Sequence, residues 1–462
     1  SVPEDLDSLA SALMDRDPAA RPRIPQVLEA LGVTHASRAR TTSPSGATPR
    51  LVGRQAELAS LDEAYRRSHG GRPTIVLVRG RSGIGKSALL QSFAREVEAS
   101  RAVVLSGRCY ESESVPFKGL DGIVDSLSRF LAMSSSDTLG RLLPPNLGDL
   151  ATLFPVLRRV KPLAAAFARR ALAEQSVQRT RSQGFACLRE LMRRLGETTP
   201  LLVVLDDVQW ADDDSARGLV ELVRGDSPPS MMLLLGARTE GEGPVIRDLF
   251  GSDVGEAISA LDRTALDLAP LPMEAMREIA RRELGADEHL IELVARDSHG
   301  VPFAAGELAR FLREGEVDEA TFESGAPIDA VVRRRVEMLG EAGRRVLQMV
   351  AIAGEPTPSS VVLQALALDD DDRAPVDELR ERAFVRGIRS GSAVMLDTAH
   401  DRIRESVLES LDASLRADLH LRLALVLEGL ETPPHDRLAR HFAIAGERSL
   451  GRLHAAAAAE DA

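Results

Sequence analysis

Cysteine, aromatic residues and long apolar runs are all scarce in this chain of 462 residues. The two cysteines, Cys109 and Cys187, are far apart and outside any metal-ligand spacing, so the pattern indicates neither a disulfide framework nor a cysteine-based metal site. Aromatic residues make up 3%, so we expect cores packed mainly by Leu, Val, Ala and Ile. Because no apolar run reaches the length of a membrane span and no signal peptide opens the chain, we expect a cytoplasmic protein without a membrane partner.

An excess of basic residues is also missing. The formal net charge is −12, which argues against a nucleic-acid surface spread over the chain, so we expect no nucleic-acid partner for this part. The length predicts roughly three domains. The chain starts at Ser1 and stops inside an Ala-rich helical pattern at residues 453–462, so we interpret it as a fragment of a longer polypeptide.

Short apolar runs alternate with helical patterns between residues 50 and 270, which predicts an α/β domain with a parallel sheet. The expected strands are Thr74–Val78, Arg101–Ser106, Leu201–Leu205, Met231–Leu235 and Ala265–Leu268. The pattern is then helical to about Gly315, and residues 328–415 mix helices with a β-hairpin formed by Phe384–Ile388 and Ala393–Leu396.

A phosphate-binding loop follows the first of these strands. Residues 80–87 read Gly-Arg-Ser-Gly-Ile-Gly-Lys-Ser and match G-x-x-x-x-G-K-[ST] at every position, with a strand before and a helix after. The glycines let backbone N–H groups converge on phosphates, and the positive end of the following helix adds to the field. Lys86 is expected to reach the β- and γ-phosphates, and the Ser87 hydroxyl to bind Mg²⁺.

Acidic residues end a second strand. Asp206 and Asp207 follow Leu201–Leu205, at the sheet edge where ligands bind in open α/β folds. Asp206 is the candidate for holding Mg²⁺, and Asp207 could orient or polarise the attacking water. Arg238, three residues past the Leu run of the next strand, is either a sensor of phosphate charge or a surface arginine.

Three segments together resemble the STAND branch of the AAA+ ATPases, which are signal-transduction ATPases with numerous domains. They are Leu51–Leu58, the loop at 80–87, and Leu205–Asp212. Further likeness lies in the Gly-x-Pro motif at residues 300–302, in His400–Glu405, which resembles the segment closing a winged-helix domain, and in Arg437–Ala462, which looks like an entry into tetratricopeptide repeats.

The resemblance implies ATP or ADP with Mg²⁺ as ligands. Val52, Gly53 and Arg54 would lie near the adenine, Pro302 would contact the base or ribose, and Trp210 would pack behind the acidic strand. The phosphate-binding set would be Gly80, Ser82, Gly83, Ile84, Gly85, Lys86, Ser87 and Ala88. No arginine finger supplied in trans is found, so we expect slow hydrolysis.

The N-terminal segment has a resemblance of its own. Leu13–Pro22 followed by Val27–Leu31 is similar to the last two helices of a serine/threonine protein kinase, with Arg21 matching an arginine of that fold. The glycine-rich loop, H-R-D and D-F-G segments of a kinase are absent, so everything catalytic belongs to the P-loop domain.

These patterns predict a P-loop NTPase core followed by helical regions. The expected domains are a kinase C-lobe remnant at 1–32, a linker at 33–49, the AAA+/STAND core at 50–270, a helical lid at 271–327, a winged-helix domain at 328–415, and the start of tetratricopeptide-like repeats at 416–462. The core carries a long helical insertion between Gly107 and Leu195.

The favoured hypothesis is an ATP-binding, slowly hydrolysing switch within a multidomain bacterial serine/threonine kinase. Its partners would be nucleotide, the upstream kinase domain of the same chain, and a protein or small-molecule signal sensed by the C-terminal repeats. Two alternatives stay open: the ATPase core of a transcription regulator whose DNA-binding domain lies outside this chain, and a nucleotide-bound scaffold without turnover.

Overall fold

The computed structural model describes most of the chain after residue 50. The described residues are 51–111, 117–144, 147–160, 177–225, 227–241, 243–252, 254–255, 258, 260–314, 328–368, 373–390 and 393–461. The predicted kinase remnant at 1–32 and the linker at 33–49 lie outside them, as do residues 161–176 of the helical insertion. No helix in the described part is long and apolar enough to cross a membrane.

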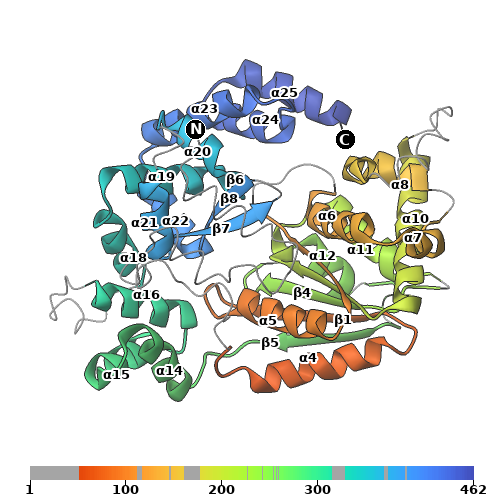
Figure 1. Ribbon diagram of the computed structural model, residues 1–462, viewed down its shortest axis with the longest axis horizontal. Coiled ribbons are helices and arrows are strands. Elements are labelled where there is room, and N and C mark those ends of the chain that lie inside the picture. Colours follow the sequence, from red (N-terminus) through yellow and green to blue (C-terminus); the bar gives the residue numbers. More distant parts are fainter. Residues whose placement is uncertain are drawn as a thin grey trace, which may run out of the picture. The chain divides into compact units, whose positions relative to one another are not determined.

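A parallel five-stranded sheet forms the centre of the first domain (Figure 1). Its strands, in the spatial order β2-β3-β4-β1-β5, are β1 (Thr74–Gly80), β2 (Val103–Arg108), β3 (Leu201–Asp206), β4 (Met232–Arg238) and β5 (Asp262–Asp267). All five predicted strands are confirmed, with shifts at their ends: β2 begins at Val103 rather than Arg101, which has a left-handed backbone (φ 66°) after the preceding helix. The predicted α/β P-loop NTPase fold is therefore confirmed.

Helices cover both faces of this sheet, as the continuous burial of β3 requires. Helices α4 (Gln55–Ser68) and α5 (Lys86–Ala99) contact β1 and β4 on one face. The other face packs against the core of α6 (Lys118–Met133), α10 (Val177–Thr198) and α11 (Asp213–Val223).

The helical insertion is a real packing unit in its described parts. On α6, an apolar stripe at helical spacing is buried: Leu120, Ile123, Val124, Leu127 and Leu131. Two short helices, α7 (Ser136–Leu142) and α8 (Leu147–Leu153), and the 3₁₀ helix η1 (Pro155–Arg159) complete it, and α8 contacts α10. The insertion thus extends the core on the β2 side of the sheet.

The strand register places the predicted site residues along one sheet edge. Gly80 at the end of β1 pairs with Arg238 at the end of β4, and Arg108 at the end of β2 pairs with Asp206 at the end of β3. Parallel strands end at a common edge, so the P-loop and both acids meet there.

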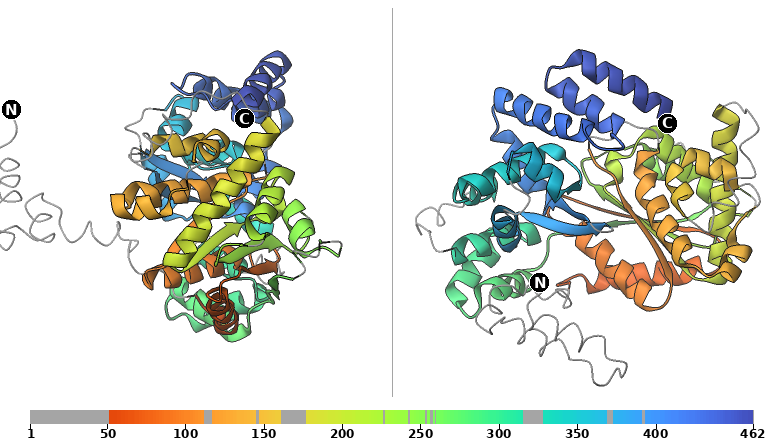
Figure 2. Two further views of the ribbon diagram at one scale, coloured as in Figure 1. Left: turned by 90° about the vertical axis from the view of Figure 1, so that its right-hand side faces the viewer. Right: turned by 45° about the horizontal axis from the view of Figure 1, so that its top comes forward.

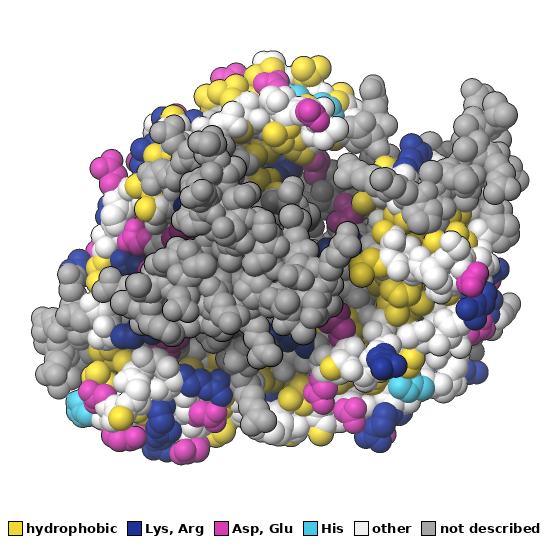
Figure 3. All heavy atoms as spheres, in the orientation of Figure 1, with side chains coloured by type: hydrophobic (Ala, Val, Ile, Leu, Met, Phe, Trp, Pro, Cys, Tyr) yellow, Lys and Arg dark blue, Asp and Glu magenta, His cyan; other side chains and the backbone are white. Residues whose placement is uncertain are grey.

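Three helices after Pro270 occupy the segment predicted as a lid: α14 (Met273–Leu284), α15 (Glu288–Asp297) and α16 (Pro302–Arg313). Their shared core includes Val52 from the start of the P-loop domain. Figure 3 shows basic and acidic side chains mixed over α14 and α15, where Arg277 pairs with Glu292 at 2.7 Å. Because the two signs alternate, this face carries no strong field of one sign.

The next segment combines helices with a small antiparallel sheet in the order β6-β8-β7. The predicted hairpin is confirmed by β7 (Val385–Ser390) and β8 (Ala393–Thr398), and β6 covers Thr357–Pro358. The helices are α18 (Ile328–Glu337), α19 (Glu341–Ala353), α20 (Ser359–Ala365), α21 (Ala374–Glu381) and α22 (Asp401–Glu409).

Arg335 of α18 joins this segment to the one predicted as a lid. Its guanidinium is fully buried and is ion-paired with Glu307 and Glu314, the second at 3.0 Å. Breaking a buried pair leaves an uncompensated charge, so this contact holds the two segments in one arrangement.

The last described helices are α23 (Ala413–Glu428), α24 (His435–Ile444) and α25 (Arg448–Asp461), seen at one end of the unit in Figures 1 and 2. Helix α23 runs across the predicted domain boundary at residue 415, and one hydrophobic core continues from Val332 to Phe442. The segment predicted as the start of the repeats is therefore packed directly onto the segment before it.

Two histidines are buried between α23 and α24. Nδ1 of His420 lies 2.7 Å from Nδ1 of His441. Burial, followed by the charge of Arg440, lowers the pKa of His420 to about 4 and that of His441 to about 2. Both rings are therefore neutral near pH 7 and share one hydrogen bond.

Acid is expected to destabilise this region. Since an unfolded histidine has a pKa of about 6.5, the unfolded chain binds more protons between that pH and the folded pKa. The free energy of unfolding should fall by about 1.4 kcal/mol per histidine for each pH unit below about 6.5, and this stability is fully present above that pH. Urea unfolding between pH 7 and 5 measures the slope, and His441→Gln should reduce it. An equal slope in this variant would contradict the assignment.

Candidate functional site

The P-loop has the backbone conformation that a phosphate cradle needs. Gly83 (φ 81°) and Gly85 (φ 99°) both adopt the left-handed conformation that favours glycine. Helix α5 begins at Lys86 directly after Gly85, so the N–H groups of its first turn have no partners within the helix. Those groups and the helix dipole favour an anion at this point.

Lys86 folds back over the loop. Its Nζ donates to the carbonyl oxygens of Gly80 (2.7 Å) and Arg81 (3.1 Å). Burial lowers the pKa of Lys86, although Asp207 and Asp206 act in the opposite direction. The ammonium is thus held at the loop by main-chain oxygens, and no carboxylate within hydrogen-bonding distance of it is found among the described residues.

Asp206 and Asp207 lie at the edge as predicted, in different surroundings. Oδ1 of Asp206 accepts the backbone N–H of Asp207 (3.0 Å). A Cβ on Gly236 of β4 would lie 2.3 Å from that oxygen, so glycine leaves room for the acid. Asp207 is buried, and burial together with Asp206 raises the pKa of Asp207 to about 6.

Both oxygens of Asp207 are engaged. Oδ2 accepts from Nε of Arg108 (2.9 Å), and Oδ1 accepts from Nε2 of Gln209 (3.1 Å). Gln209 lies on the 3₁₀ helix η3 (Val208–Trp210), which follows Asp207. Asp207 itself has a left-handed backbone (φ 57°), which turns the chain sharply at the strand end.

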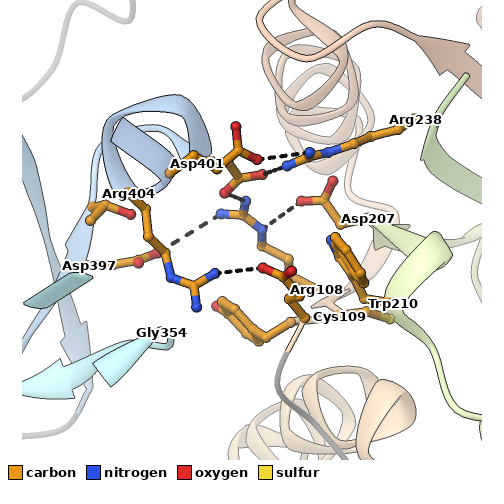
Figure 4. A pocket seen from close by; sticks show the side chains of 13 residues that line it. Arg108, Cys109, Asp207, Trp210, Arg238, Gly354, Asp397, Asp401 and Arg404 are labelled. Atoms are coloured by element: carbon orange, nitrogen blue, oxygen red, sulfur yellow. Dashed lines mark hydrogen bonds and ion pairs between the residues drawn. The ribbon is translucent and has the colours of Figure 1, made fainter. Parts of the chain in front are cut away.

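Two arginines at this edge reach helix α22 (Figure 4). Arg108 donates from Nη2 to Asp401 at 2.8 Å, and Arg238 donates to Asp401 at 3.0 Å and to Glu405 at 2.9 Å. The pKa of Asp401 is lowered: burial raises it, but Arg108 and other cations outweigh that effect. Arg238 is the last residue of β4, and its side chain is 19% exposed, so it is not a simple surface arginine.

These residues line a pocket between the sheet edge and α22. The wall also contains Arg404, whose Nη1 donates to Glu111 at 3.1 Å. Trp210 lies in the wall as well, and the Arg238 guanidinium lies 5.9 Å from its ring centre. Carboxylates outnumber arginines here, so the pocket is a salt-bridged junction rather than an anion site.

The residues predicted near the adenine lie between the P-loop domain and the segment predicted as a lid. Val52 is in the lid core, and a Cβ on Gly53 would lie 2.9 Å from the Cβ of Ala275 on α14. Arg54 donates to the carbonyls of Ile84 (3.1 Å) and Ala269 (2.8 Å), so it braces the P-loop against the chain leading to the lid. Its side chain is 3% exposed.

Pro302 also reaches the loop. It opens α16, and a Cβ on Gly85 would lie 3.8 Å from its Cγ. The Gly-x-Pro motif therefore stands directly against the glycines of the P-loop. Of the remaining predicted binding residues, Ser87 is half-buried and Ala88 is exposed at the start of α5.

The residues present fit a magnesium–nucleotide complex. The left-handed glycines and the free N–H groups of α5 suit phosphates, and Nε of Arg54 is buried without an acceptor in the part of the chain that the structure describes. No group of three or more His, Cys, Asp or Glu side chains that could hold a metal occurs among the described residues. Proteins typically hold Mg²⁺ by one or two side-chain oxygens together with phosphates and water, and Ser87 and Asp206 are the residues that would supply those oxygens.

Sequence reasoning missed the importance of Arg108. Only its position as the last residue of a strand could have indicated it, because its carboxylate partner Asp401 lies 293 residues away. In the sequence, the segment that contains Asp401 and Glu405 is notable only for its resemblance to the end of a winged-helix domain. Its pattern predicts no role for these two residues in the site.

Comparisons with known proteins agree with this geometry. Residues 50–235 match the model of the AAA ATPase domain. An uncharacterized protein of Rhizobium meliloti (strain 1021) is 24% identical over 396 residues, which cover 81% of this chain and 36% of that protein. A Signal Transduction ATPase with Numerous Domains (STAND) protein with a tetratricopeptide repeat sensor, from Pyrococcus horikoshii, has a TM-score of 0.51 at 16% identity, covering 89% of this chain and 51% of its own.

The chain thus contains an AAA ATPase domain, and its fold over most of its length is like that of a STAND protein. It spans 36% and 51% of the lengths of these two proteins.

Proposed function

We propose that this chain is an ATP-binding and slowly hydrolysing switch. In this switch, the docking of helix α22 depends on whether the nucleotide site is occupied. The observation that carries the proposal is that two arginines of the sheet edge bind the same carboxylate, Asp401. Arg108 and Arg238 end the strands on either side of Asp207, and both donate to this one carboxylate of α22.

Each residue has a chemical task in this proposal. Lys86 and the N–H groups of the loop would hold the phosphates, and Ser87 and Asp206 would bind Mg²⁺, which when bound neutralises phosphate charge. Asp207 would orient and polarise the attacking water. Arg238 would respond to charge at the phosphate end of the site.

The switch itself would be the exchange of partners by the two arginines. When α22 is docked, its carboxylates neutralise both arginines, as in this structure. An added phosphate charge at the edge competes with Asp401 and Glu405 for the same cations, so docking and site occupancy become linked. A ligand shifts such an equilibrium only through its differential affinity for the two arrangements.

The output would be control of a serine/threonine kinase upstream in the same polypeptide. The support is the kinase-like pattern at residues 1–32. Helices followed by a β-hairpin favour a winged-helix identity for 328–415, and paired helices α24 and α25 favour a repeat-type sensor for a protein or small-molecule signal.

Asp401→Asn tests the proposed link between α22 and the site. The variant removes the carboxylate charge that competes with phosphate for both arginines, so we expect Mg·ADP to dissociate about tenfold more slowly, which corresponds to about 1.4 kcal/mol. Stopped-flow release of a fluorescent ADP analogue measures the rate. Asp418→Asn is the matched control, since that carboxylate pairs only locally with Arg422 on the exposed face of α23. Equal release rates in wild type and Asp401→Asn would refute the link.

A further inference from the structure

Phe303 lies between the P-loop and the first turn of α22. Its backbone N–H donates to the carbonyl oxygen of Gly83 at 3.2 Å. Its ring stacks on the imidazole of His400, with ring centres 4.1 Å apart and planes inclined by 26°. Neither contact belongs to the ion pairs that join Arg108 and Arg238 to α22, so Phe303 connects the P-loop to the same helix through a second set of contacts.

The contact with the P-loop leaves little space. A Cβ on Gly83 would lie 3.0 Å from Cβ of Phe303 and 3.3 Å from Cγ1 of Val301. The left-handed conformation of Gly83 (φ 81°) presents its carbonyl to the start of α16. Because close-packed groups transmit displacement, a change in the loop at Gly83 must move Phe303 or break its hydrogen bond.

The contact with α22 is equally direct. His400 is the N-cap of α22, and its Nδ1 accepts the backbone N–H of Arg402 at 3.1 Å, which fixes the ring relative to the helix. Burial lowers the pKa of His400 to about 4, so the ring that stacks on Phe303 is uncharged near pH 7. The next residue is Asp401, which holds both arginines.

We propose that Phe303 is the positioning residue that couples the P-loop to the docking of α22. The inference rests on the proposed switch function and adds the route of coupling: from the Gly83 carbonyl through the Phe303 backbone and ring to His400. Loss of the ring leaves the loop and α22 in place but uncouples them.

The test is a cycle of substitutions read by calorimetric titration with Mg·ADP. In wild type, Asp401→Asn should strengthen ADP affinity about tenfold, within the range of coupling between sites. In a Phe303→Leu background the same substitution should change affinity by less than about twofold. Phe303→Tyr keeps the ring and should restore the full effect.

His400→Asn approaches the stack from the other side. Asparagine retains the N-cap acceptor but lacks the ring, so this variant should also abolish the effect of Asp401→Asn. If circular dichroism shows that Phe303→Leu does not fold, His400→Asn replaces it in the cycle of substitutions.

A full effect of Asp401→Asn in the Phe303→Leu or His400→Asn background would overturn the inference, as would no effect in wild type. If wild type failed to bind Mg·ADP, or if Lys86→Ala bound it equally well, the proposed function itself would fall.

Discussion

Lys86→Ala is expected to weaken Mg·ATP binding at least about 100-fold. Charge-assisted hydrogen bonds contribute up to about 3 kcal/mol, and Lys86 supplies such contacts within a largely buried loop. In this structure its Nζ donates to the carbonyls of Gly80 and Arg81, so the ammonium is held at the loop. Isothermal titration with Mg·ATP measures the loss.

Arg81→Ala is the matched control for Lys86. It removes the same charge from the same loop, but its side chain is exposed, and we expect at most about a threefold change. Affinity for Mg·ATP that stayed within about threefold of wild type in Lys86→Ala would remove the basis for the nucleotide site.

Asp207→Asn is expected to slow single-turnover ATP hydrolysis by about 100-fold or more, the usual range for loss of a general base. Asparagine is close to aspartate in shape but has a single acceptor oxygen, so only one of Gln209 and Arg108 keeps its acceptor. Affinity for Mg·ATP should change little, since Asp207 is not expected to hold the phosphates or the metal. Rapid-quench measurement of one turnover separates the two quantities.

Asp397→Asn controls for the ion-pair partner of Asp207. Asp397 lies on β8, 3.9 Å from Arg108, and also pairs with Arg386. It should leave the hydrolysis rate within about threefold of wild type, because it touches neither loop nor acidic strand end. A hydrolysis rate in Asp207→Asn equal to that of wild type would contradict the role given to Asp207. No measurable hydrolysis by the wild-type chain would instead favour the scaffold that holds nucleotide without hydrolysis.

The switch proposal joins these two predictions to the behaviour of α22. Asp207 shares Arg108 with Asp401, so the residue expected to act on water and the helix expected to move have a common cation. In the proposed switch, hydrolysis and the docking of α22 therefore depend on the same charges, and a change in one shifts the other.

Local sequence determined the nucleotide-binding half of this protein. The run Thr74–Val78, the glycines of the loop and the Leu run before Asp206 predicted strands, turn and helix within a few residues of where they lie. A strand buried on both faces must be apolar along its whole length, and a loop that binds phosphate needs the backbone freedom of glycine. Each of these features therefore depends on consecutive residues. Parallel pairing then brings the strand ends to one edge.

Only the tertiary structure decided what faces that edge. Arg108 and Asp401 are separated by 293 residues, and strands β2 to β5 with the helices between them separate Gly83 from Phe303, so no local period indicates that they touch. An arginine at a strand end looks the same in sequence whether it faces water, phosphate or a distant carboxylate. The partner of such an arginine depends on how the segments after residue 327 pack. The buried Arg335 and the shared core of α19 and α23 determine that packing. It is a property of the whole chain.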